Sequence, residues 1–129
     1  MNKEELKYSK EHEWVKLDGD TATVGITDFA QNQLTDIVFV ELPEKGKHAT
    51  QNKEVAVVES VKSVSDIFAP VSGEIAEVND KVKDSPEMIN KDPYGEGWLI
   101  KIRLEDKEEL KSLMSHDDYE KFISSKGGN

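Results

Sequence analysis

Hydrophobic and polar positions alternate along this chain in short runs, a pattern that favours strands over long helices. Residues 8–26 contain two β-branched runs on either side of Asp18-Gly19, a tight-turn signal, and therefore predict a hairpin. Residues 97–104 alternate most strictly, so we expect another strand there. Residues 36–42 are almost continuously apolar, which predicts a strand buried on both faces. The apolar face of the strand expected at 97–104 would consist of Trp98, Ile100, Ile102 and Leu104.

Helix signals are few and short. Thr27-Asp28 predicts the cap of a helix at 28–34, in which Ala30 and Leu34 share a face. Residues 47–53 are polar with little pattern, and residues 79–96 are rich in turn residues, so both segments predict loops.

The C-terminal segment, about 105–124, predicts further helices. Asp106 with Glu109 resembles a capping pair, and Ser115 with Asp118 marks a second helix start. Together with the strands, this segment predicts a mainly β fold: a small sandwich or flattened barrel decorated with helices. Since no linker divides the chain, we expect residues 1–129 to form a single domain.

One stretch, about 54–75, stands out from the other predicted strands. Its sequence is EVAVVESVKSVSDIFAPVSGEI, two β-rich runs around a polar apex that holds Lys62. An exposed lysine ordinarily contributes only solubility. At this apex the neighbours Ser60, Val61 and Ser63 are small or uncharged, so the amine is accessible from several directions. We therefore interpret Lys62 as a site where an enzyme attaches a group.

The net charge of the chain limits the classes of binding partner that we expect. The 129 residues include 17 Lys and Arg against 27 Asp and Glu, a formal net charge of −10. This acidity argues against nucleic acid, which requires a basic surface, and against anionic membranes. It favours partners with basic docking surfaces, although solubility alone explains it equally well.

Other features indicate where the protein works. No cysteine is present, so disulfides, thiol nucleophiles and cysteine-based zinc sites are excluded. The charged N-terminus lacks the apolar region of a secretory signal, and no apolar run has the length of a membrane span. We therefore expect a cytoplasmic protein.

The chain lacks the components of an active site of its own. His12, His48 and His116 have no metal-ligand spacing, so we expect no metal site. His12 beside Glu13 could form a catalytic pair, although a surface strand end explains them more simply. No nucleophile elbow, phosphate loop or dinucleotide fingerprint occurs. The chemistry would therefore come from partners or from a cofactor on Lys62, as in carriers of lipoamide or biotin.

Several longer segments carry a more specific pattern. They are GITDFAQ at 25–31, VFVELPEKG at 38–46, ESVKSVSD at 59–66, APVSGE at 69–74 and DPYGEGWLIKI at 92–102, with HEWV at 12–15 and LMSHDDYEKFI near the C-terminus. In order and separation, these segments resemble the H proteins of the glycine cleavage system over nearly the whole chain.

This resemblance implies a lipoyl-domain-like fold, a flattened sandwich (barrel-sandwich hybrid) of two antiparallel sheets with short helices. It implies that Lys62 carries lipoate through an amide bond and that the protein is a carrier without catalytic activity. The implied partners are a pyridoxal-phosphate-dependent glycine decarboxylase, an aminomethyltransferase and dihydrolipoamide dehydrogenase. Lipoyl or octanoyl transferases, or a lipoate ligase, would modify Lys62.

The resemblance also implies a cleft that shelters the loaded arm from water. Glu13, Gln33 and Asp66 match positions near that cleft. Some family members have histidine where this chain has Gln33, and glutamine forms hydrogen bonds but does not titrate near neutral pH.

Three alternatives remain open from the sequence. The protein could also donate lipoyl groups to other carriers in a relay, or it could be a biotin or other lipoyl carrier domain, or an independent enzyme. Biotin domains usually place the lysine between methionines, whereas Val61 and Ser63 flank Lys62 here.

Overall fold

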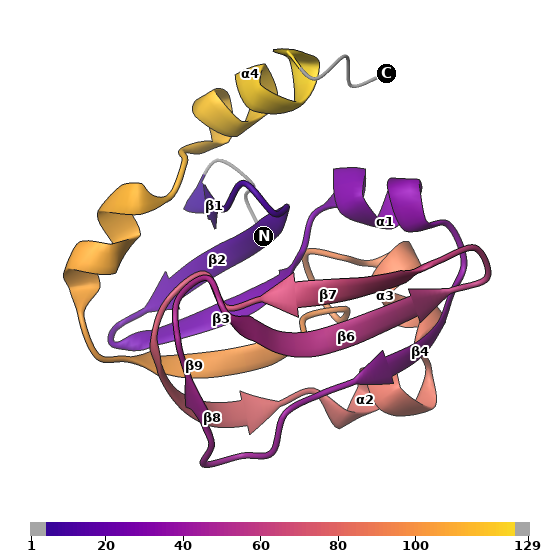
Figure 1. Ribbon diagram of the computed structural model, residues 1–129, viewed down its shortest axis with the longest axis horizontal. Coiled ribbons are helices and arrows are strands. Elements are labelled where there is room, and N and C mark those ends of the chain that lie inside the picture. Colours follow the sequence, from indigo (N-terminus) through magenta and orange to yellow (C-terminus); the bar gives the residue numbers. More distant parts are fainter. Residues whose placement is uncertain (1–4, 126–129) are drawn as a thin grey trace.

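The computed structural model describes residues 5–125, which form two antiparallel sheets (Figure 1). The larger sheet has the strand order β1-β2-β3-β9-β8-β5, and the smaller has the order β4-β6-β7. The strands are β1 Lys7–Tyr8, β2 Glu13–Asp18, β3 Thr21–Ile26, β4 Ile37–Glu41, β5 His48–Ala49, β6 Glu54–Ser60, β7 Val64–Phe68, β8 Gly73–Val78 and β9 Ile100–Leu104. The predicted mainly β sandwich is confirmed.

The helices are short and lie outside the sheets (Figure 1). They are α1 Asp28–Leu34, α2 Asp80–Asp84, α3 Glu87–Lys91, a 3₁₀ helix Lys107–Ser112 and α4 His116–Ser125. Even α4 has only ten residues, and no helix between residues 5 and 125 has the length and apolar character that a membrane crossing requires.

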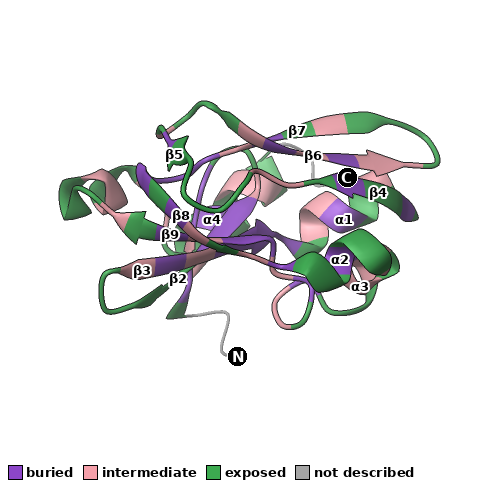
Figure 2. Cartoon of the chain, turned by 90° about the horizontal axis from the view of Figure 1, so that it is seen from below, coloured by how far each residue is buried: buried purple, intermediate pink, exposed green. Residues whose placement is uncertain are grey.

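The two sheets enclose the main hydrophobic core. Figure 2 shows β6 and β7 as one layer, with β2, β3, β8 and β9 in the other. Side chains from both layers are fully buried between them, including Val24, Val58, Ile75 and Ile102. A second cluster holds α4 against the body, where Tyr119 stacks on Tyr8 with ring centroids 4.6 Å apart. The alternating burial of these strands follows from their period of two.

The hairpin predicted within 8–26 is confirmed. β2 and β3 pair from Glu13↔Ile26 to Asp18↔Thr21, and Gly19 turns the chain with φ +64°. The helix at 28–34 is also confirmed, since Thr27 Oγ1 accepts a hydrogen bond from Ala30 N at 3.2 Å. In both cases the local turn or cap chemistry decided the structure.

The expected double-sided burial of residues 36–42 is wrong. β4 is an edge strand that pairs only with β6, and Val38 and Phe39 are 54% and 49% exposed. Ile37 and Val40 are buried, so only one face of the strand is covered. A continuous apolar run cannot distinguish a buried strand from an edge strand whose outer face serves another purpose.

Two segments predicted as loops contain regular structure. Within 47–53, β5 pairs with β8, but its two residues are too few to show a period. Within 79–96, α2 and α3 each have five residues, and their buried side chains are Val82 and Ile89. Turn residues here also start helices, as when Asn79 Oδ1 accepts from Lys81 N at 3.2 Å.

The C-terminal prediction is confirmed with one change. Asp106 caps the 3₁₀ helix through Glu108 N at 2.9 Å, and Ser115 caps α4 through Asp118 N at 3.2 Å. Glu109 does not close a capping box, because its carboxylate accepts hydrogen bonds from the backbone and side chain of Ser72 at 2.7 and 2.8 Å. It therefore joins the C-terminal segment to the larger sheet.

Candidate functional site

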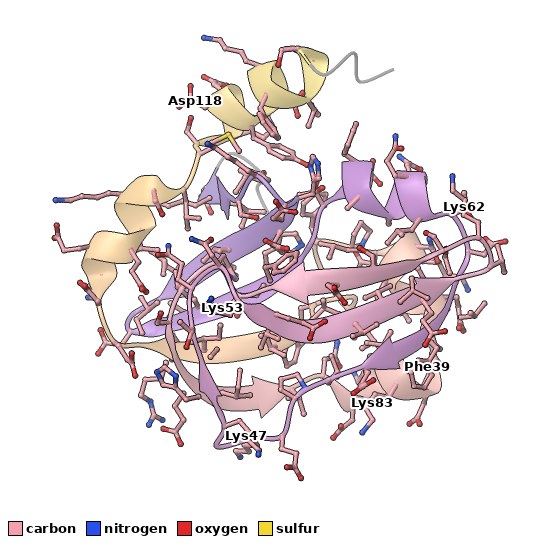
Figure 3. The ribbon with its side chains drawn as sticks, in the orientation of Figure 1. Phe39, Lys47, Lys53, Lys62, Lys83 and Asp118 are labelled. Atoms are coloured by element: carbon pink, nitrogen blue, oxygen red, sulfur yellow. The ribbon has the colours of Figure 1, made fainter. Side chains whose placement is uncertain are left out.

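Lys62 lies at the apex of the β6–β7 hairpin, at one end of the molecule (Figure 3). Residues 61–63 form the tip, and Ser60 orders it: its Oγ accepts from Lys62 N at 3.2 Å and from Ser63 N at 3.0 Å. Ser60 N donates to Ser63 O at 2.8 Å. The side chain of Lys62 is exposed, and no ion pair among residues 5–125 involves it. The hairpin thus presents an accessible amine on an ordered turn.

The tip is also braced from the side. Val61 N donates to Asp36 O at 3.0 Å, just beyond the C-terminal end of α1. Asn90 of α3 fixes that region, because its Oδ1 accepts from Ile37 N at 2.9 Å and its Nδ2 donates to Thr35 O at 2.8 Å. The role of Asn90 could not be predicted from the sequence, since these two partners are backbone atoms of a distant segment; its Nδ2 also donates to Gln31 Oε1 at 2.8 Å.

Glu13 is only 1% exposed and joins the two sheets. One carboxylate oxygen accepts a hydrogen bond from the Ser9 hydroxyl, and the other accepts from Phe68 N of β7 at 3.1 Å. Burial raises the pKa of Glu13 to about 7, although the hydrogen bonds from Ser9 and Phe68 lower it. A carboxyl with this pKa changes charge near neutral pH.

Glu13 borders a hollow of about 350 Å³ between β2, β7 and the C-terminal segment. The other residues that line it are Ser9, Lys10, Glu11, Asn52, Phe68, Ser112 and Leu113. Neither Gln33 nor Asp66 belongs to this lining. Of the three residues matched to the arm cleft, only Glu13 lines this hollow.

Asp66 and Gln33 lie nearer to the hairpin tip. Asp66 is exposed on β7, two residues before Phe68, and Gln33 is exposed on α1, three residues before Asp36. Phe68 lies four strand residues beyond Val64, about 13 Å along β7. The order along the molecule is thus Lys62, then Asp66, then the hollow at Glu13.

The suggested His12–Glu13 pair does not form. His12 Nδ1 lies 2.8 Å from the Tyr119 hydroxyl, whereas the Glu13 carboxylate bonds to Ser9 and Phe68. His12 precedes β2 in a left-handed backbone conformation with φ +70°, and its ring meets Tyr119 of α4 instead of the Glu13 carboxylate. His12 thus helps to attach α4 to the sheet.

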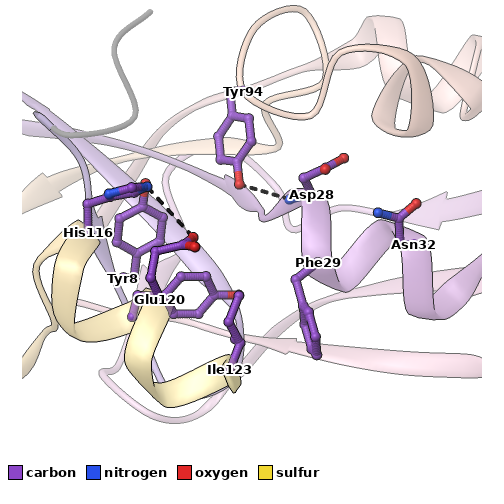
Figure 4. Close-up of a pocket in the computed structure, with 9 residues that line it drawn as sticks. Tyr8, Asp28, Phe29, Asn32, Tyr94, His116, Glu120 and Ile123 are labelled. Atoms are coloured by element: carbon purple, nitrogen blue, oxygen red, sulfur yellow. Dashed lines mark hydrogen bonds and ion pairs between the residues drawn. The ribbon is translucent and has the colours of Figure 1, made fainter. Parts of the chain in front are cut away.

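A second hollow, of about 230 Å³, separates α1 from α4 (Figure 4). There the Tyr94 hydroxyl accepts from Asp28 N at 2.9 Å, and His116 Nε2 lies 3.7 Å from Glu120 Oε2. Lys62 and the three cleft candidates are not part of its lining. The site residues predicted from the sequence therefore do not meet in this second hollow.

Comparisons with known proteins agree with these features. The family model described as "Glycine cleavage H-protein" matches residues 6–126. Glycine cleavage system H proteins of Halothermothrix orenii and Coprothermobacter proteolyticus are 53% and 57% identical to this chain, and each match covers 93% of it. The matches cover 94% and 95% of those two proteins.

A solved structure supports the same relationship. The crystal structure of a glycine cleavage system H protein from Mycobacterium marinum superimposes with a TM-score of 0.85 at 36% sequence identity. The match covers 96% of this chain and 98% of that one. The chain belongs to the glycine cleavage H-protein family.

Proposed function

We propose that this protein is a lipoyl carrier of the glycine cleavage system and that Lys62 is its attachment site. The observation that carries the proposal is an exposed, unpaired lysine held at the apex of an ordered hairpin in a chain of this family. The fit is chemical as well as geometric, since a primary amine is the group that forms an amide with a carboxylic acid. Lipoate bound there would supply a disulfide that accepts two electrons together with the aminomethyl group of glycine.

The chain's own residues hold and orient the attachment point. Ser60 and Asp36 fix the backbone on either side of Lys62, so the point of attachment stays rigid while its side chain remains free. A rigid pivot limits the volume that a tethered group explores and raises its effective concentration at a docked enzyme.

The hollow at Glu13 suits a sheltered amine. Excluding water protects a labile group from hydrolysis, and a carboxylate at the wall favours a cationic amine. We propose that Glu13 performs this role and that Asp66 and Gln33 lie along the path from Lys62. Because glutamine is uncharged, Gln33 would contribute hydrogen bonds but no titrating group.

The proposed partners follow from this carrier role. They are the glycine decarboxylase, the aminomethyltransferase, dihydrolipoamide dehydrogenase, and the transferase or ligase that modifies Lys62. The protein itself supplies placement and no catalytic group, so the isolated unmodified chain should turn over no substrate.

The proposal is tested by substituting Lys62, the proposed attachment point. We expect Lys62→Arg to fold normally but to gain no lipoyl mass in cells supplied with lipoate, and to abolish glycine decarboxylation in a reconstituted system. Lys53→Arg is the matched control, because Lys53 is also exposed but lies before β6. Intact mass and a Lys62 peptide distinguish lipoate from biotin. Lipoate on the Lys62→Arg variant would refute the assignment.

A further inference from the structure

Thr35, between α1 and β4, has a backbone conformation that its residue type disfavours. Its φ of +64° and ψ of −147° lie close to a region that glycine adopts readily and other residues rarely do. A β-branched side chain at a positive φ is a true outlier. Such a conformation persists only where the surrounding contacts hold it. The turn from α1 into β4 therefore needs an external restraint.

Asn90 of α3 supplies this restraint. Its Nδ2 donates to Thr35 O at 2.8 Å and its Oδ1 accepts from Ile37 N at 2.9 Å, so one side-chain amide holds the backbone on both sides of Asp36. The amide is itself fixed, because Nδ2 also donates to Gln31 Oε1 of α1 at 2.8 Å. α3 packs against both α1 and β4 (Figure 1). Asn90 therefore clamps the turn from a third element.

The residue at the centre of this clamp contacts the hairpin tip. Asp36 O accepts a hydrogen bond from Val61 N at 3.0 Å, and Val61 immediately precedes Lys62. In the part of the chain that the structure describes, this is the one hydrogen bond that links residues 61–63 to a segment outside the hairpin. The placement of the tip therefore depends on the Asp36 carbonyl and, through it, on Asn90.

We propose that Asn90 is a positioning residue for the carrier: it holds Thr35 in its strained conformation, aims the Asp36 carbonyl at the hairpin tip and so fixes the pivot of the lipoyl arm. This inference rests on the proposed function. A pivot that moves lowers the effective concentration of the far end of the arm in the active site of a docked enzyme. Loss of Asn90 should therefore slow transfer within the docked complex and leave docking itself intact.

Amide hydrogen exchange in the unmodified protein tests the structural half of the proposal. In Asn90→Ala, the Val61 N–H should exchange roughly fivefold faster or more, because its acceptor is no longer held in place. Asn79→Ala is the matched control, since Asn79 Nδ2 also donates to two backbone carbonyls, Glu96 O at 2.8 Å and Trp98 O at 2.7 Å. This control should leave Val61 exchange within about twofold of wild type. The amides of β3, in the middle of the larger sheet, report any global unfolding in both variants.

A second substitution tests whether the strain at Thr35 is the reason that Asn90 is needed. Glycine adopts a φ of +64° without steric cost, so Thr35→Gly removes the tendency of the turn to relax. We expect the double variant Asn90→Ala with Thr35→Gly to return Val61 exchange to within about threefold of wild type. If the double variant exchanges as fast as Asn90→Ala alone, the strain at Thr35 has no part in placing the tip and the proposal is wrong on this point.

Steady-state kinetics of the lipoylated proteins with the glycine decarboxylase test the functional half. Asn90→Ala should lower kcat roughly threefold or more and leave the KM for the carrier within about twofold of wild type, and the added Thr35→Gly should restore kcat. A carrier that is only destabilised would instead raise the apparent KM, because fewer molecules are folded, and would keep kcat at saturation. Asn79→Ala should therefore retain the wild-type kcat. Unchanged Val61 exchange in Asn90→Ala, or faster exchange with unchanged kcat, would overturn this inference alone. A wild-type protein that gains no lipoyl group on Lys62 would refute the proposed function, whereas the exchange measurement does not depend on lipoate.

Discussion

Glu13 shows how one residue can serve a fold and a site with opposing demands. Its hydrogen bonds from Ser9 and Phe68 tie β2 to β7, yet its burial opposes ionisation. An apolar residue would fill the same space without this conflict. The presence of a titrating group at the wall of the hollow is therefore better explained by binding than by stability.

The raised pKa of Glu13 predicts a specific pH dependence. Because the folded-state pKa of about 7 exceeds the ordinary 4.5, the folded state binds the proton more tightly. The protonated Glu13 side chain therefore stabilises the folded protein below about pH 4.5, and this stabilisation is lost as pH rises to about 7. Glutamine has the same shape and cannot ionise. The free energy of unfolding of the Glu13→Gln variant, minus that of the wild-type protein, should therefore increase by about 3 kcal/mol between pH 4 and pH 8.

Urea unfolding of both proteins across this pH range measures the difference. All other titrating groups are common to the pair, so their contributions cancel. Two parallel stability curves would mean that the pKa of Glu13 is not raised in the folded protein.

At the scale of elements, Thr27 joins α1 to α4. It is fully buried, caps α1 through Ala30 N, and its Oγ1 lies 2.7 Å from the Tyr119 hydroxyl. We expect Thr27→Ala to destabilise the protein by about 2 kcal/mol, from the lost cap and from the lost partner of a buried hydroxyl. Thr27→Ser keeps the hydroxyl and should retain most of the stability. Thermal unfolding distinguishes the two, and equal losses would assign the effect to the missing methyl group.

Elements with local signals could be predicted from the sequence. Asp18-Gly19 and Thr27 each specify a structure through neighbouring atoms, and both predictions hold. The exposure of β4 depends on which strand lies beside it, and the helices at Val82 and Ile89 are too short to show a period. Those features depend on the assembled sheets and leave no periodic trace in the chain.

The candidate site likewise combines features that have local sequence signals with features that depend on the assembled sheets. The hairpin apex at Lys62 could be predicted, because strand patterning and the small neighbours are local. The partners of Glu13 could not, since Phe68 contributes a backbone N–H from the other sheet. Gln33 and Asp66 matched cleft positions by motif, yet the hollow at Glu13 excludes both. Motif similarity shows which residues of this chain match the cleft positions of the family, whereas the shape of a pocket depends on how the folded chain packs.

The net charge of −10 belongs to the whole molecule and predicts how it meets its partners. Salt screens interactions between exposed charges beyond about 8 Å at physiological ionic strength. If acidic side chains steer the protein to a basic surface of the decarboxylase, its apparent KM in the decarboxylase assay should rise several-fold between about 20 and about 300 mM KCl. Sucrose at equal osmolarity is the control, because it leaves electrostatic interactions unscreened. A flat response to KCl would mean that the acidic surface serves solubility and that the encounter depends on apolar contact alone.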